Sequence, residues 1–185
     1  MPSLSLQALN RATLARQLLL QRSPLTPLRA IERLAGLQAQ APNPPYIALW
    51  TRLARFQPAM LTRLLEQRRV LRAAAMRSTL HLLAPADYRA WRPALAPVLE
   101  RSLLSSSGKA LAGATLAEVV QAGCRLLEHA PMTHGELGRA LAQRWHGHDP
   151  TALANALRNL APLVHRPPAG TWGSTAHAQL VHLDR

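Results

Sequence analysis

Apolar residues in this chain recur in short blocks at helical spacing, and a proline or capping residue interrupts each block before it grows long. The first block predicts a helix over about residues 5–20, with leucines on one face at Leu6, Leu9, Leu14 and Leu18. Thr26-Pro27 starts a second helix, because it places a capping residue before a proline in the first turn. We expect that helix to end near Gln40, since the prolines at 42, 44 and 45 lack an amide proton and push their predecessors out of helical geometry. The pattern predicts a fold of many short helices.

Short strands are predicted after two further helices. The helices fit residues 46–53, with Trp50 as a large core residue, and residues 58–67. The string RRVLRAAAMRSTLHLL then reads as two short strands, and a helix from Pro85 to about Val98 follows. Three helices followed by a basic ribbon is the order of a winged helix.

The second half repeats this order after a run of small residues. SLLSSSGKALAGAT predicts a linker over 101–114. Thr115 with Glu118, and Thr133 with Glu136, match the capping box, so helices should begin directly after each threonine. Asp149-Pro150 starts a third helix, and LVHR, PPAG and TWGST form a second wing. We therefore expect a mainly α fold with short β-ribbons, arranged as tandem winged-helix units over 1–100 and 115–185.

Charge indicates the partner. The chain has 22 Lys+Arg against 9 Asp+Glu, for a net charge of +13. Genomic base bias accounts for arginine replacing lysine, with Lys109 the only lysine, but not for the shortage of acids. Double-stranded DNA is the expected partner. One cysteine, no bilayer-length apolar run and no basic-then-apolar start predict a cytoplasmic, nucleoid-associated protein with no membrane contact.

The helix starting near Thr151 suggests a DNA-reading surface in the second unit. Its leucines face inward, which leaves Asn155, Arg158 and Asn159 on the opposite face, and these are residue types that contact bases and phosphates. A polar outer face is equally normal for any amphipathic helix. Arg166 adds a cation to the second wing, whereas Trp172 is expected to plug the core beneath it.

The most informative string is GLQAQAPNPPYIALWTRL with the ribbon after it. Gln38, Ala39 and Gln40 form a Gln-apolar-Gln motif ahead of an aromatic helix that contains Trp-Thr-Arg. Arg77, Thr79, Leu80 and His81 form an Arg-Xaa-Thr-Leu-His ribbon. This ordered set, with the basic wing HRPPAGTWGS, resembles the AlkZ-like family of winged-helix DNA glycosylases over nearly the whole chain.

The resemblance implies excision of bulky or cross-linked N7-alkylated guanines. It gives Gln38 and Gln40 the catalytic role of positioning a water at the sugar carbon; ordinary solvation of a helix end is the alternative. Cations of the first ribbon are expected on DNA, together with His81, unless that histidine is a packed spacer: Arg68, Arg69 and Arg77. Lys109 lies in the small-residue run, so we expect a monofunctional enzyme without a Schiff base.

No metal or cofactor is expected. His146, His148 and Asp149 could bind a metal ion opportunistically, but a polar turn explains them more simply. Typical members of the family are about twice this length, with a third winged-helix unit and a β-rich C-terminal domain that complete the DNA channel. A missing C-terminal domain or a partner is therefore expected to complete it here. The alternative is a truncated family member, or a winged-helix module that binds DNA or regulates without chemistry.

Overall fold

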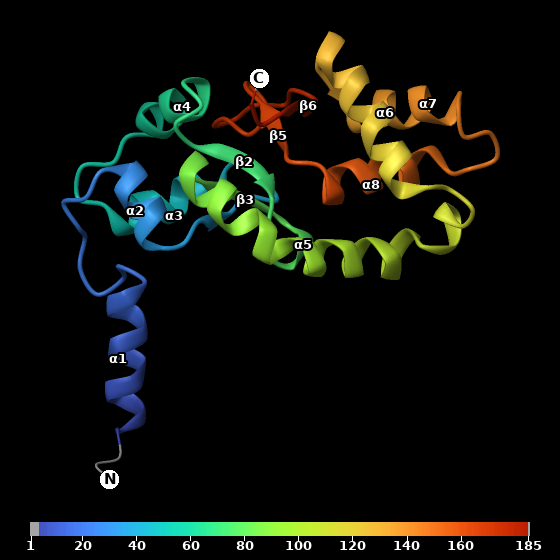
Figure 1. Cartoon of the computed structure of the whole chain (residues 1–185). Helices are drawn as coiled ribbons and strands as arrows, with labels where there is room; N and C mark the ends of the chain where they lie inside the picture. Colours follow the sequence, from blue (N-terminus) through green and yellow to red (C-terminus); the bar gives the residue numbers. More distant parts are fainter. Residues whose placement is uncertain (1–3, 185) are drawn as a thin grey trace.

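The computed structural model describes residues 4–184, which form a mainly helical protein around one antiparallel sheet (Figure 1). The first half has this order: α1 (Leu6–Arg16), α2 (Pro27–Arg33), β1 (Leu37–Gln38), α3 (Pro44–Arg52), α4 (Pro58–Glu66), β2 (Leu71–Ala74), a 3-10 turn η1 (Met76–Ser78) and β3 (Leu80–Leu83). The second half continues with α5 (Pro85–Ser107), a 3-10 turn η2 (Lys109–Leu111), α6 (Leu116–His129), β4 (Met132–Thr133), α7 (His134–Ala142), α8 (Pro150–Leu160), β5 (Leu163–Arg166) and β6 (Gln179–His182).

The two halves share one six-stranded sheet, in the order β1-β3-β2-β5-β6-β4. Each half contributes three strands, and the halves meet where β2 pairs with β5, with Ala73 opposite Val164. From α2 to β3, and again from α6 to β6, the order is helix, strand, two helices, two strands, and the first strand of each set lies at an outer edge.

Helix α2 ends earlier than the expected position near Gln40. It stops at Arg33, and Ala35 and Gly36 follow with φ of 56° and 94°. The Gly36 amide donates to the Ile31 carbonyl at 2.9 Å, which closes the helix in a Schellman-like turn. Gly36 therefore ends the helix before the prolines do, and Gln38 lies in strand β1.

Helix α5 occupies the first part of the linker that was expected over residues 101–114. It continues through residues 101–107 instead of ending near Val98, and Pro93 and Pro97 lie inside it. Leu99 and Leu103 are fully buried, and Leu103 belongs to the core of the second half. This packing outweighs the missing proline donors and the small-residue composition.

The other predicted helix starts are confirmed. Thr26, Thr115, Thr133 and Asp149 are all N-caps. The full capping box forms at Thr133, whose hydroxyl accepts from the Glu136 amide while the Glu136 carboxylate accepts from the Thr133 amide. Thr115 has no side-chain capping bond.

Three hydrophobic clusters support the sheet. One packs α2, α3 and α4 around the fully buried Leu49 and Leu61, and a second packs α6, α7 and α8 around Leu153 and Leu157. The third lies between the sheet and α5, where Tyr88 is 1% exposed. The sheet is thus covered on both faces.

Some apolar residues lie outside these cores. Trp50, expected in the core, is 54% exposed, and the Arg22 guanidinium lies 4.7 Å from its ring centroid. Helix α1 projects away from the body of the protein and contains no buried residue (Figure 1). Among residues 4–184, no helix has both the length and the apolar character needed to cross a bilayer.

Candidate active site

Gln38 and Gln40 are both exposed, where strand β1 ends and a bend begins. Gln38 is in β1, opposite His81 of β3, and Ala39 continues the pairing by donating its amide to the Leu80 carbonyl at 2.7 Å. Side chains alternate along an extended chain, so Ala39 turns inward, 1% exposed, while both glutamines face outward and are exposed. The two exposed amides are thus separated along the chain by one buried residue.

The two glutamines differ in their hydrogen bonding. The Leu80 amide donates to Gln40 Oε1 at 3.1 Å, which anchors the Gln40 side chain and leaves its Nε2 as a free donor. The Gln38 side chain makes no hydrogen bond to residues 4–184, so its amide can both donate and accept. One fixed donor beside one adaptable amide suits the orientation of a small polar molecule such as water.

His81 adjoins this face but is buried, at 5% exposure. Its Nδ1–H donates to the Thr79 carbonyl at 3.0 Å. Burial lowers the pKa of His81, the hydrogen bond to Thr79 opposes that shift, and the nearby Arg77 cation adds to it. The ring is packed on the same face of the sheet as Gln38, and its burial favours the alternative of a packed spacer over a direct contact with DNA.

Arg72 supports the motif from the other face of the sheet, and sequence reasoning missed it. Its Nε donates to the Ala39 carbonyl at 2.9 Å and its Nη2 to the Gln40 carbonyl at 3.1 Å. Nη1 donates to His165 Nδ1 at 2.9 Å. Burial lowers the pKa of Arg72, which is 7% exposed. The available signal was an arginine inside the apolar string VLRAAA.

The loop between β5 and β6, the expected second wing, contacts the start of α3. The Gly173 amide donates to Asn43 Oδ1 at 3.0 Å, and the Tyr46 and Trp172 rings meet edge to face at 5.4 Å. Trp172 is 49% exposed, so the expectation of a core plug is wrong: Tyr46 fills the core and Trp172 lies over it. The second half of the chain therefore contacts the residues that directly follow the Gln-Ala-Gln motif.

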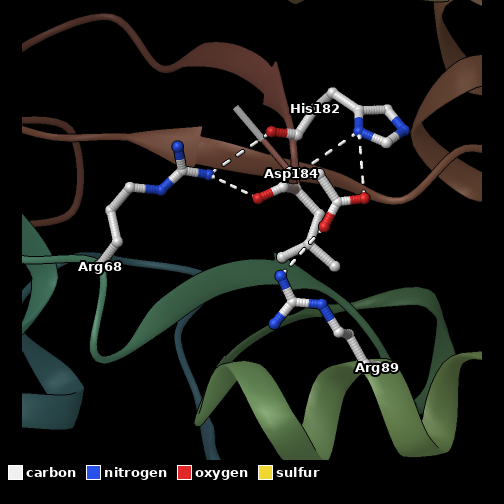
Figure 2. A network of polar contacts seen from close by, with 5 residues as sticks. Arg68, Arg89, His182 and Asp184 are labelled. Atoms are coloured by element: carbon white, nitrogen blue, oxygen red, sulfur yellow. Dashed lines mark hydrogen bonds and ion pairs between the residues drawn. The ribbon is translucent and has the colours of Figure 1, made fainter.

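The expected cationic DNA contacts of the ribbons lie in different environments. Arg69, Arg77 and Arg166 are exposed. Arg68 is partly buried, and its Nη2 donates to the carbonyls of His182 and Leu183 at 3.4 and 3.0 Å, as Figure 2 shows. Beside it, Arg89 and Asp184 form an ion pair at 3.0 Å (Figure 2). Arg68 therefore holds the end of β6 to the first half.

The expected outward face of α8 is corrected. Asn159 is 5% exposed, and its Oδ1 accepts from the Ser78 hydroxyl at 2.6 Å. Asn155 and Arg158 are partly buried, and Arg158 donates to the Ser78 carbonyl at 3.0 Å. Helix α5 packs against α8, and Ser78 of turn η1 bonds to this face of α8, so these polar side chains join the two halves instead of facing a groove.

The predicted polar turn contains no metal cluster. Among residues 4–184, no three His, Cys, Asp or Glu side chains lie close enough together to hold a metal ion. His148 Nε2 instead donates to the Ala112 carbonyl at 3.2 Å, and Asp149 caps α8.

Both the sequence and the fold are similar to those of known proteins. A family model described as DNA glycosylase AlkZ-like matches residues 31–183. The solved structure of the DNA glycosylase AlkZ of Streptomyces sahachiroi superposes with a TM-score of 0.63 at 22% identity, over 92% of this chain and 47% of that one. This chain therefore spans about half the length of that structure. No curated protein sequence matches. Because the family model covers most of the chain, including the glutamine motif and both halves of the sheet, the protein belongs to the AlkZ-like DNA glycosylase family.

Proposed function

We propose that this protein is a monofunctional DNA glycosylase that hydrolyses the N-glycosidic bond of alkylated purines, such as N7-alkylguanines or their cross-links, in base excision repair. The observation that carries the proposal is that Gln38, at the end of strand β1, and Gln40, in the bend after it, are both exposed on either side of the buried Ala39. A helix would have separated the two side chains.

The chemistry requires little beyond a positioned water. A purine alkylated at N7 already carries positive charge, so its bond to the sugar breaks through an oxocarbenium-like state without strong acid help. The free Gln40 Nε2–H donates a hydrogen bond to the oxygen of the water, and Gln38 Oε1 accepts a hydrogen bond from the water, which aims a lone pair at the sugar carbon. The bond from the sugar carbon to N9 breaks, N9 keeps the electron pair, and the cationic base leaves as the neutral alkylated base. The water oxygen bonds to the sugar carbon and releases one proton to the solvent, which leaves an abasic site.

Double-stranded DNA binding is supported by charge and architecture. The net charge of +13 favours a polyanion, and the repeated order of helices and strands around the sheet supports two winged-helix units. The exposed cations Arg69, Arg77 and Arg166 are the proposed phosphate contacts among the expected residues. The second unit does not offer α8 for reading bases, because α5 covers it.

A second candidate function is DNA binding without excision. It is favoured by the net charge of +13 and by the exposed Arg69, Arg77 and Arg166, because cations bind phosphates whatever the state of the base. In this case the basic surface binds DNA, and Gln38 and Gln40 do not catalyse release of a base.

The test is release of free base from duplex DNA that contains N7-methylguanine. We expect release by the protein, and loss of release in the Gln38→Ala, Gln40→Ala double variant. The control is the Gln121→Ala, Gln143→Ala double variant, which removes two exposed amides from α6 and the end of α7. Binding by all three proteins without release by any would reject the glycosylase and leave the binding module.

A salt titration of DNA binding tests the partner. Each phosphate neutralised by an arginine contributes about −0.9 to the slope of log affinity against log salt. A slope near zero would reject both candidate functions.

A further inference from the structure

The buried guanidinium of Arg72 has neutral partners only. It contacts two backbone carbonyls and the His165 ring, and no carboxylate among residues 4–184 forms an ion pair with it. Burying a cation without an anion is unfavourable by several kcal/mol. A single arginine held in this way indicates that its geometry matters to the protein.

The surroundings are shaped to hold that geometry. Gly170 has φ of 92°, and a Cβ at this position would lie 2.8 Å from Arg72 Cδ. A glycine therefore lets the wing backbone press against the middle of the arginine side chain. His165 accepts from Nη1 through Nδ1, which requires a neutral ring with its proton on Nε2.

The two carbonyls that Arg72 holds flank Gln40. Regular pairing in β1 covers Leu37 and Gln38 alone. Beyond it the chain bends, and this bend is held by the Ala39 amide bond to β3 on one side and by Arg72, which bonds to two consecutive carbonyls, on the other. Because side chains alternate, Arg72 lies on the opposite face of the sheet from His81 and Gln38. It supports the motif from behind without reaching its exposed face.

We infer that Arg72 is a positioning residue that fixes the backbone of Ala39 and Gln40, and with it the place of Gln40 relative to Gln38, and that His165 of β5 couples this geometry to the second half of the chain. The inference rests on the proposed function for its effect on catalysis. Its structural content is independent of turnover: without Arg72, the bend that begins at Gln40 should lose its fixed geometry.

The experiment compares Arg72→Met, Arg72→Lys and His165→Leu with the parent, and uses Arg125→Met as a control that removes an exposed arginine from α6. Two quantities are measured: the single-turnover rate of base release at saturating protein, and hydrogen exchange at the Ala39 amide. DNA affinity and thermal unfolding are measured alongside. Should Arg72→Met fail to fold, Arg72→Lys and His165→Leu still test the inference.

We expect Arg72→Met to release base about 100-fold more slowly, because a displacement of about 1 Å in a catalytic group has an effect of that size. DNA affinity should change by less than about threefold, since the buried Arg72 is not exposed to a bound DNA. Arg72→Lys should recover part of the rate, because an ammonium donates to one carbonyl without the planar geometry that holds both. His165→Leu should reduce the rate in the same direction.

Exchange at Ala39 should rise in Arg72→Met and stay at the parent value in Arg125→Met. Unchanged exchange in a folded Arg72→Met protein would overturn the positioning role, whatever the activity. If the parent releases no base, the proposed function fails, and the exchange measurement still decides the inference. A loss of DNA affinity that matches the loss of rate would also overturn it, because it would place Arg72 in binding.

Discussion

Adding one methyl group at Gly170 should disrupt the arginine network, and the chain provides a matched control. Gly170→Ala puts a Cβ 2.8 Å from Arg72 Cδ and 3.4 Å from its Nε. The middle of the Arg72 side chain cannot swing aside, because three hydrogen bonds fix the guanidinium. Gly147→Ala places alanine at nearly the same backbone geometry, φ of 86°, with no atom within 4 Å of the added Cβ.

The expected magnitudes separate the two variants. Alanine in a left-handed conformation is unfavourable by roughly 1–2 kcal/mol, and that is the whole effect expected for Gly147→Ala. Gly170→Ala adds the weakening of up to three hydrogen bonds, each contributing about 0.5–1.5 kcal/mol. We therefore expect Gly170→Ala to lower the free energy of unfolding by about 2–4 kcal/mol more than Gly147→Ala.

Urea unfolding of the two variants measures this difference. In an Arg72→Ala background, the excess effect of Gly170→Ala should disappear, because the atom that the methyl group meets is gone. Equal losses of stability in Gly170→Ala and Gly147→Ala would refute the reasoning and show that Arg72 adjusts freely. If Gly170→Ala still lowers the free energy of unfolding more than Gly147→Ala when Arg72 is absent, the added methyl group must disturb another contact of the loop between β5 and β6.

Three further predictions concern other parts of the fold. Burial lowers the pKa of His165 to about 3, aided by the cations Arg72 and Arg158 and by His134. The unfolded chain then binds a proton below about pH 6.5 that the folded protein refuses until about pH 3, so stability should fall with acidification by about 1.4 kcal/mol per pH unit in that window. His165→Leu should remove this pH dependence. If the free energy of unfolding, measured by urea denaturation, changes with pH by the same amount in the parent and the variant, the prediction is wrong. Thr133→Ala should lower the free energy of unfolding by about 1 kcal/mol through loss of the capping box. Thr115→Ala, at a cap without a side-chain bond, should have a smaller effect, and a larger one would contradict the assignment. Asn159→Ala should lower stability by about 1–3 kcal/mol, since it leaves the Ser78 hydroxyl without its acceptor; chemical denaturation that shows no change would place this pair outside the stabilising interface.

The local signals in the sequence predicted most elements. Thr26-Pro27, Thr133 with Glu136, and Asp149-Pro150 each mark a helix start, because capping depends on residues within one turn. The end of α2 was expected near Gln40, at the prolines. The helix ends at Arg33 for a local reason, because Gly36 closes it before the prolines are reached. The extent of α5 was missed for a tertiary reason, since Leu99 and Leu103 are held by distant cores.

The surface of the protein was the least predictable. Trp50 and Trp172 were expected inside and are about half exposed, whereas Asn159 and His81 were expected outside and are buried. Hydrophobic pattern identifies which face of a helix is apolar. It does not reveal that α5 and η1 lie over the polar face of α8, because that depends on contacts between residues far apart in sequence.

The sequence by itself determined the family, the helical character, the positive charge and the Gln-Ala-Gln motif, since these follow from composition and short-range order. The tertiary structure alone decided that the two halves share one sheet, that Arg72 holds the carbonyls of Ala39 and Gln40, and that His165 in turn accepts from Arg72. The physical reason is that strand pairing and a buried guanidinium join segments separated by 30 residues or more: Ala39 to Arg72 spans 33 positions and Arg72 to His165 spans 93. No local pattern records such contacts.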